Sequence, residues 1–217
     1  MGFPVFNDSV RFADQPQAAA AVLCRTEHGN FHLGISYKRA FGPPNFLHLG
    51  FQDYLSTEWN WRFLWATADV EPERLDPVAG WCRLIWNRFL ETGQLPYGIG
   101  WDGATFDSTG RLMLKSGEVG LTCSTFVLSV FLNAGIKVVE QSTWPVRPED
   151  DAKFVDSLAS FASPDILASL RREISSGAVR IWPAEVMAAF ACTIPAHFDS
   201  ARRRVEDLAA DLDLLRP

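Results

Sequence analysis

The stretch that decides the fold is residues 117–136, GEVGLTCSTFVLSVFLNAGI. A polar segment punctuated by glycines changes at Cys123 into an apolar run, and Gly135 is well placed to end a helix there. The apolar side chains follow helical spacing, at Phe126, Val127, Val130, Phe131 and Ala134. The sequence therefore predicts a helix that begins close to Cys123 and turns one apolar face toward a core.

Cys123 lies in the first turn of that predicted helix. Unpaired N–H groups and the helix dipole stabilise negative charge there, which lowers the pKa of a thiol and favours an oxyanion. Gly120 before it and Ser124 after it leave little bulk around the sulfur. These features predict a nucleophile. The alternative is a buried packing residue, because free cysteines are commonly buried. The sequence favours packing for the other three cysteines, Cys24, Cys82 and Cys192.

Strands are predicted in the first third of the chain. Four apolar or aromatic segments cover residues 18–27, 30–39, 45–55 and 59–69. The second and third are separated by AFGPP, residues 40–44, which is turn chemistry. This part of the chain therefore predicts a small antiparallel sheet.

Helical patterns dominate after residue 70. Asp76 and Pro77 predict the N-cap and the first residue of a helix that ends at Gly93. The sequence DSTG, residues 107–110, predicts a short hairpin inside a long loop. Further helices are predicted at residues 147–162, 163–177, 182–193 and 195–215, the last two either separate or as one helix broken at Pro195.

We therefore expect an α+β protein. A small antiparallel sheet would pack against the nucleophile-bearing helix in residues 1–146. Residues 147–217 would form a helical C-terminal extension that packs on or beside this domain.

Two of the four histidines, His32 and His48, stand in the matching frames FHLGIS and LHLGFQ. Alternate residues of a strand share a face, so each histidine projects from the polar or small face, opposite its apolar neighbours. In an antiparallel hairpin the two side chains lie opposite or diagonal, within reach of each other. One could be a general base and the other its orienting partner. The alternative is a pair of partly buried histidines bonded to backbone or water.

The other two histidines carry weaker signals. His197, in IPAHFDSARRR, predicts a surface or capping role at the start of the last helix, and His28, in RTEHGN, reads as a turn residue. Their positions relative to Cys123 do not mark either as its base.

Two segments carry a family resemblance. HLGISYKRAFGPPNFLHLGF, residues 32–51, resembles the catalytic hairpin of papain-like hydrolases of the NlpC type, and GLTCSTFVLSVFLNAGI, residues 120–136, resembles their nucleophile helix. In ordinary NlpC-type enzymes the cysteine helix precedes the histidine strands, whereas here it follows them. This order is similar to the circularly permuted branch, which includes the lecithin:retinol acyltransferase relatives and a group of bacterial hydrolases. The resemblance covers residues 18–54 and 97–136.

The resemblance implies Cys123 as nucleophile, His32 as general base and His48 as the third polar residue of the site. The hairpin loop is longer than the usual tight turn of the family, so a second assignment stays open. In that assignment His48 is the base, and its orienting residue is one of Asp53, Glu58 and Asn60.

The implied activity is that of a cysteine hydrolase, an amidase or peptidase that cleaves an amide or isopeptide bond through a thioacyl-enzyme. An acyltransferase or thioesterase acting on a lipid or ester is one alternative, and a non-catalytic papain-like binding module is another. The substrate would be peptide-like or acyl, and no cofactor or metal is expected. The loop LPYGIGWDGATF is expected to line the cleft, with Tyr97 and Trp101 as substrate contacts or, alternatively, as plain aromatic packing.

Composition limits the partners. The formal net charge is −6, which argues against general nucleic-acid binding, and the only tight basic run, Arg202–Arg204, reads as a solvated helix face. No CxxC spacing marks a zinc or redox motif. The N-terminal residues MGFPVFNDSV carry no secretory pattern, and no apolar stretch reaches the roughly 18 residues that a membrane span needs. We expect a cytoplasmic protein without stable membrane insertion; the sequence does not indicate an oligomeric state.

Overall fold

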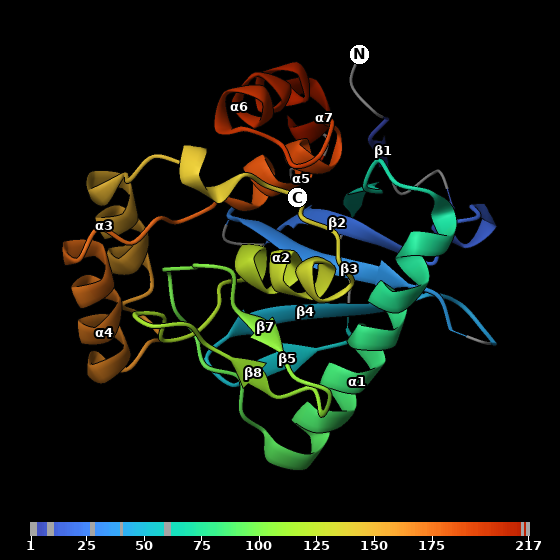
Figure 1. Ribbon diagram of the computed structural model, residues 1–217. Helices are drawn as coiled ribbons and strands as arrows, with labels where there is room; N and C mark the ends of the chain where they lie inside the picture. The colour runs from blue at the N-terminus through green and yellow to red at the C-terminus, as the bar shows by residue number, and fades with distance from the viewer. Residues whose placement is uncertain are drawn as a thin grey trace.

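A computed structural model describes residues 4–7, 11–26, 29–39, 41–58, 62–213 and 215. Within them, six strands form one antiparallel sheet in the order β1-β6-β2-β3-β4-β5 (Figure 1). The strands are β1 (Phe6–Asn7), β2 (Ala19–Arg25), β3 (Phe31–Tyr37), β4 (Asn45–Phe51), β5 (Tyr54–Ser56) and β6 (Phe63–Ala66). Two residues discussed above, His28 and Asn60, lie outside the described residues.

The helices follow the sheet along the chain. They are α1 (Asp76–Thr92), α2 (Cys123–Asn133), α3 (Pro148–Ser157), α4 (Pro164–Ser175), α5 (Pro183–Phe190), α6 (Phe198–Asp207) and α7 (Ala209–Asp213). A small hairpin of β7 (Thr105–Phe106) and β8 (Leu112–Met113) lies between α1 and α2, where DSTG predicts it. The expected α+β class is confirmed.

One predicted helix boundary is wrong by a residue. Asp76 is not the N-cap of α1 but its first residue, because a 3-10 turn over Pro72–Leu75 leads directly into the helix. The predicted end is confirmed: Gly93 has φ 61°, and its N–H donates to the Phe89 carbonyl at 2.7 Å. A left-handed residue at this position is the usual reason for a glycine after a helix.

The predicted strand over residues 45–55 is two strands. It turns at Gln52 and Asp53, where Asp53 has φ 51°, and the chain returns as β5 on the sheet edge. The Asp53 side chain accepts the Leu95 N–H at 2.7 Å, which ties this turn to the loop after α1. Alternation of apolar residues alone does not reveal the turn, because the same pattern continues through it.

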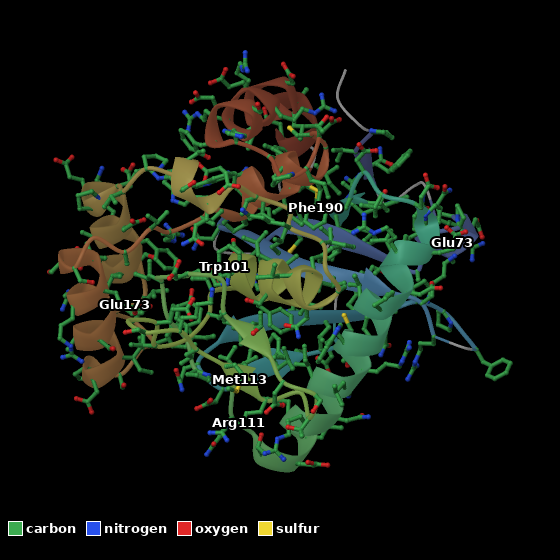
Figure 2. All side chains as sticks on the ribbon, viewed as in Figure 1. Glu73, Trp101, Arg111, Met113, Glu173 and Phe190 are labelled. Atoms are coloured by element: carbon green, nitrogen blue, oxygen red, sulfur yellow. The ribbon has the colours of Figure 1, made fainter. Side chains whose placement is uncertain are left out.

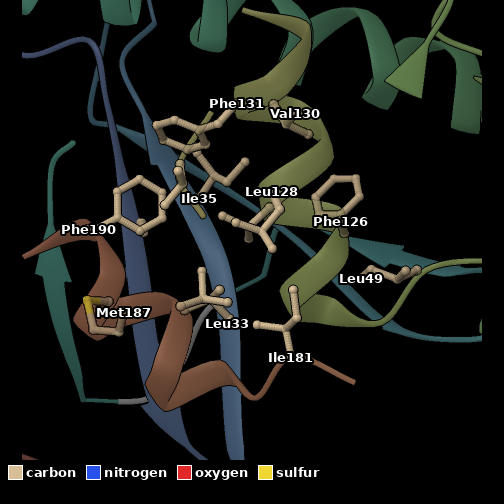
Figure 3. Packing of buried hydrophobic residues seen from close by; sticks show 14 of the residues in the cluster. Leu33, Ile35, Leu49, Phe126, Leu128, Val130, Phe131, Ile181, Met187 and Phe190 are labelled. Carbon is tan, nitrogen blue, oxygen red and sulfur yellow. The ribbon is translucent and has the colours of Figure 1, made fainter. Parts of the chain in front are cut away.

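The main core lies between the sheet and α2. Figure 3 shows Leu33 and Ile35 of β3 directed toward Leu128 and Phe131 of α2. Phe190 of α5 packs edge-on against Phe131, with ring centroids 4.7 Å apart. Burying each such side chain contributes about 1.5–3 kcal/mol. This packing fixes where α2 begins relative to β3, and the candidate site lies at that start.

Residues from the C-terminal part belong to this same core. Met187 and Phe190 of α5 are fully buried in it, while α3 and α4 lie to one side (Figure 1). The two last predicted segments are separate, on either side of Pro195: residues 182–193 contain α5, and residues 195–215 contain two helices, α6 and α7. The division of the chain at residue 147 into two units stays a prediction.

Among the helices of the described residues, none has the length and apolar character to cross a membrane.

Candidate active site

Cys123 is the first residue of α2, as the sequence predicts. Thr122 and Thr125 form a reciprocal cap before it: the Thr122 Oγ1 accepts the Thr125 N–H at 3.2 Å, and the Thr125 Oγ1 accepts the Thr122 N–H at 2.8 Å. Gly135, with φ 76°, follows the last turn. The cap fixes the backbone on both sides of the thiol and holds it at the helix start.

A cavity of about 240 Å³ lies at this helix start. It opens at one end of the sheet, where β2 ends, β3 begins and β4 ends, and both Cys123 and His32 line it. Its opposite wall comes from α3 and from the segment between α4 and α5. Cys123 and His32 therefore line the same cavity.

The thiol of Cys123 lies close to β3 beside His32. The backbone N–H of Leu33, the next residue along the strand, favours its thiolate form. Cys123 is partly exposed at the cavity surface but is densely surrounded by protein. This burial raises the pKa of its thiol, although Leu33, Arg180 and Ser124 favour the thiolate. The lowered thiol pKa expected from the helix start alone is wrong, because desolvation is the larger effect.

His32 and His48 form the pair that the matching frames predict. The hydrogen-bonded pairing of β3 with β4 covers Ile35–Tyr37 and Asn45–Leu47, so both histidines lie beyond its last pair. There the rings themselves bond: His32 Nε2 and His48 Nδ1 are 2.9 Å apart, with the ring planes at 85°. Both side chains are buried.

A backbone carbonyl completes this chain. His48 Nε2 lies 2.8 Å from the carbonyl oxygen of Glu58, and a carbonyl only accepts, so His48 Nε2 carries the proton. Neutral His48 then presents Nδ1 as an acceptor, and His32 Nε2 is the donor. In this arrangement His32 Nδ1 carries the lone pair. This order makes His32 Nδ1 the acceptor nitrogen of the His32 ring.

Both imidazoles are held neutral. Burial, and then the charge that His48 would carry, lowers the pKa of His32 to about 3. Burial also lowers the pKa of His48, and the Glu58 carbonyl partly offsets this. The neutral form of each ring is what the donor and acceptor order requires.

The residues proposed to orient His48 as a base lie differently. Glu58 does contact His48, but through its backbone carbonyl. The Asp53 carboxylate bonds the Leu95 N–H and the Gln52 side-chain amide instead. Asn60 lies outside the described residues.

Tyr97 lies in the cavity with Cys123 and is almost fully buried. Its N–H donates to Gln52 Oε1 at 2.8 Å, and its ring packs on Phe51 with centroids 4.6 Å apart. A close backbone approach places it there: an added Cβ on Gly120 would lie 2.4 Å from the Pro96 carbonyl oxygen. The structure thus brings Tyr97 to the candidate nucleophile.

Trp101 is not brought there. It is buried beside α2 (Figure 2), where its Nε1 donates to Ser129 Oγ at 2.9 Å, and it lines a second cavity that does not include Cys123. The two N–H groups before it, of Ile99 and Gly100, donate to Glu173 Oε2 of α4 at 3.0 and 2.8 Å. Within this loop only Tyr97 reaches the cavity of Cys123, and Glu173 holds the loop in place.

Sequence reasoning missed Arg180. Among the described residues that line the cavity of Cys123, it is the only one with a formally charged side chain. It lies between α4 and α5, and its guanidinium lowers the pKa of the Cys123 thiol while Cys123 in turn favours charged Arg180. No motif surrounds Arg180 in the sequence, so only the packing of the C-terminal helices reveals it.

The remaining predicted positions that the structure describes do not line the cavity of Cys123. His197 is exposed at the N-cap of α6, and Cys192 is partly exposed at the end of α5. Cys24 and Cys82 are buried, as the sequence favours. In the described part of the chain no group of three or more His, Cys, Asp or Glu side chains is arranged to hold a metal ion.

Comparisons with protein-family models, curated proteins and solved structures found no match for this chain.

Proposed function

We propose that this protein is a cysteine hydrolase with a circularly permuted papain-like arrangement, which cleaves an amide or isopeptide bond through a thioacyl-enzyme. One observation carries the proposal. A hydrogen-bonded chain runs from the Glu58 carbonyl through His48 to His32, and His32 and Cys123 line the same cavity. A nucleophile, a base and a group that orients the base are the parts that covalent catalysis needs.

The first half of the reaction forms the acyl-enzyme. His32 Nδ1 takes the proton from Cys123 Sγ as the sulfur attacks the carbonyl carbon and a tetrahedral oxyanion forms. The oxyanion collapses, the C–N bond breaks, and the proton on His32 passes to the leaving amine. The imidazolium that forms in between donates from Nε2 to His48, whose own Nε2–H donates to Glu58.

The second half returns the enzyme. His32 removes a proton from water, the resulting hydroxide attacks the thioester carbonyl, the C–S bond breaks, and the proton returns to sulfur as the acid is released. In both halves the oxyanion would be held by backbone N–H groups at the start of α2. The first N–H groups of a helix have no intrahelical acceptor, and of those near Cys123 the Thr125 N–H is already bonded to Thr122.

The resting pair would be uncharged. Burial raises the pKa of the thiol and lowers the pKa of His32 to about 3, so both shifts keep the proton on sulfur at neutral pH. Proton transfer would then accompany attack, with His32 acting as a general base rather than as half of a preformed ion pair.

A second candidate reaction is acyl-ester or thioester cleavage. A cavity of about 530 Å³ shares Phe31, Phe154 and Arg180 with the cavity of Cys123. Most of its lining surface is apolar, although charged side chains such as Lys153 and Glu206 also line it. Space of this kind suits an acyl chain as well as an apolar amino-acid side chain. The same nucleophile and base would serve both reactions.

Acylation by 4-nitrophenyl acetate tests the proposed function. We expect a burst of about one equivalent of 4-nitrophenolate per chain, as a covalent mechanism predicts. The burst should be absent in Cys123→Ala and retained in Cys192→Ala, which removes another partly exposed thiol. Mass spectrometry should place the acetyl group on Cys123. A burst that survives in folded Cys123→Ala, or wild-type acylation no faster than that of a free thiol, would overturn the proposal.

The leaving group separates the two reactions. Peptide 4-nitroanilides should be cleaved if an amide is the substrate. A rate that rises steeply from 4-nitrophenyl acetate to the decanoate, with no anilide cleavage, would replace the amidase by the acyl-ester reaction.

A further inference from the structure

Arg180 gives the cavity of Cys123 a positive wall. No carboxylate side chain stands among the described residues that line this cavity. Apart from Arg180 the lining is neutral, and it is rich in aromatic groups such as Phe31, Phe51 and Phe154. A cation in a partly apolar cavity attracts an anion more strongly than one in water does, because the effective dielectric constant is lower. The lining therefore has the character of a pocket for a substrate with an anionic group.

Arg180 is held both at its guanidinium and at its backbone. Its carbon lies 3.5 Å from the ring centroid of Phe154, a cation–π contact. The backbone carbonyl of Arg180 accepts the Nη2–H of Arg147 at 2.9 Å, and Arg147 is itself bonded to Glu185. Arg180 is thus positioned by the C-terminal helices and does not depend on a ligand to order it.

Asp151, the ion-pair partner of Arg180, leaves most of the N–H donors of the guanidinium unused. Arg180 Nη1 lies 3.6 Å from Asp151 Oδ1, longer than the 2.7–2.9 Å of a charge-assisted hydrogen bond. Asp151 lies on the α3 side and is not among the residues that line the cavity of Cys123. The guanidinium has five N–H donors in a planar fork suited to a carboxylate. It can therefore keep Asp151 as a neighbour and still bind an acid in the cavity.

We propose that Arg180 binds a carboxylate of the substrate beside the bond that Cys123 attacks, so that the protein acts on acidic substrates with an adjoining apolar group. This inference rests on the proposed function and names its substrate class. The carboxylate can be the C-terminal one of a peptide or an acidic side chain. The apolar group would occupy the adjoining cavity, which shares Phe154 and Arg180 with the first.

Two alkylating reagents of nearly the same shape test the proposal without a substrate. Iodoacetate carries a carboxylate and iodoacetamide a neutral amide, and both alkylate a thiol. We expect the ratio of their rates at Cys123, read by mass spectrometry, to be at least tenfold higher in the wild type than in Arg180→Gln. Arg180 also favours the Cys123 thiolate, but that effect changes both rates equally and cancels in the ratio.

Matched variants locate the effect. Arg180→Lys should keep much of the preference because the charge remains, and Arg171→Gln, at an exposed arginine of α4 paired with Asp156, should leave the ratio unchanged. Added salt should lower the wild-type ratio only modestly, because buried charges are screened less than exposed ones. If folded Arg180→Gln has the wild-type ratio, the carboxylate site is wrong, while the 4-nitrophenyl acetate burst decides the proposed function separately.

Protection experiments on the wild-type protein give a test that needs no variant. N-acetyl-phenylalanine should slow alkylation of Cys123 by iodoacetamide at least tenfold more than N-acetyl-phenylalanine amide, which lacks the charge. Protection by N-acetyl-aspartyl-phenylalanine amide would identify a side-chain carboxylate instead of a C-terminal one. Equal weak protection by all three compounds would overturn the proposal, whatever the stability of the Arg180 variants.

Discussion

The two walls of the candidate site are built in different ways. The hairpin wall places His32 and His48 from neighbouring strands in direct contact and ends the chain on the Glu58 carbonyl. The helical wall places Arg180 and Phe154 from segments that follow Cys123 far along the chain. In the proposed mechanism the first wall supplies the groups that transfer protons, and the second supplies a charge and an apolar surface. We infer that the chemistry resides in the local hairpin and the choice of substrate in the packing of the C-terminal helices.

The largest expected effect falls on the hairpin wall. His32→Asn removes the proposed base and should slow acylation by 4-nitrophenyl acetate roughly 10²–10⁴-fold. His48→Asn leaves the base but loosens its tautomer and orientation, and should cost roughly 10–100-fold. Rates for both variants, followed from pH 5 to 9, check this order. If His48→Asn proves the more damaging of the two, the base assignment must be exchanged.

A stability effect of similar size should fall on the helical wall. Arg147 bonds Glu185 at 2.5 and 2.9 Å, and Glu185 is almost completely buried. Glu185→Ala leaves the Arg147 charge buried without its partner and should cost roughly 3–5 kcal/mol of unfolding free energy. Urea denaturation measures this loss.

The iodoacetate preference and the 4-nitrophenyl acetate burst then show which of the two walls the substitution affects. Because Arg147 also bonds the Arg180 carbonyl, folded Glu185→Ala should lose the iodoacetate preference while its 4-nitrophenyl acetate burst remains. The double variant Arg147→Met, Glu185→Met should recover much of the stability, since it leaves no unpaired charge. A cost below about 1 kcal/mol for Glu185→Ala would show that this pair does not hold the helical wall.

Glu173 provides a pH-dependent test of the helical wall. Burial raises the pKa of its carboxyl to about 7, although the Gly100 and Ile99 N–H groups favour the charged form. A raised carboxyl pKa means that the folded state binds the proton more tightly, so stability is lost as pH rises from about 4.5 toward 7. The glutamine of Glu173→Gln does not titrate. The unfolding free energy of this variant should therefore rise relative to that of the wild type by roughly 2–3 kcal/mol between pH 4 and pH 8.

Chemical denaturation at several pH values measures that difference. Glu149→Gln, at an exposed glutamate of α3, controls for the loss of one negative charge. Parallel stability curves for Glu173→Gln and the wild type would contradict the assigned cause.

The hairpin wall and the start of α2 were predictable because their signals are local. Cys123 at a helix start and the shared frame of His32 and His48 follow from periodicities of a few residues. The strand turn at Asp53 was not, since an apolar alternation continues across it. The start of α1 was missed by one residue because a 3-10 turn ahead of Asp76 shifts the cap.

The helical wall was not predictable, and neither was the state of the thiol. Arg180 stands in no motif, and its place beside Cys123 depends on how α3, α4 and α5 pack. The raised pKa of Cys123 has the same origin, because desolvation depends on neighbours that are distant in sequence. Local sequence shows which groups are available for chemistry, whereas tertiary packing sets their charge state and surroundings.

The smallest expected effect concerns Gly120, which shortly precedes Cys123 and whose close backbone contact leaves no room for a methyl group. An added Cβ on Gly120 would meet the Pro96 carbonyl oxygen at 2.4 Å, so the segments that carry Tyr97 and Cys123 must separate. Gly120→Ala should cost roughly 1–3 kcal/mol and slow acylation of Cys123.

Gly80→Ala is its matched control, because Gly80 lies inside α1 with no atom within 4 Å of an added Cβ. This change should stabilise the protein by roughly 0.5–1 kcal/mol, since alanine loses less backbone entropy in a helix. Thermal unfolding and the acylation rate, measured on both variants, check the pair. If Gly120→Ala kept both wild-type stability and wild-type acylation, the loop of Tyr97 would be mobile enough to absorb the methyl group. The positioning of Cys123 would then depend on the Thr122–Thr125 cap alone.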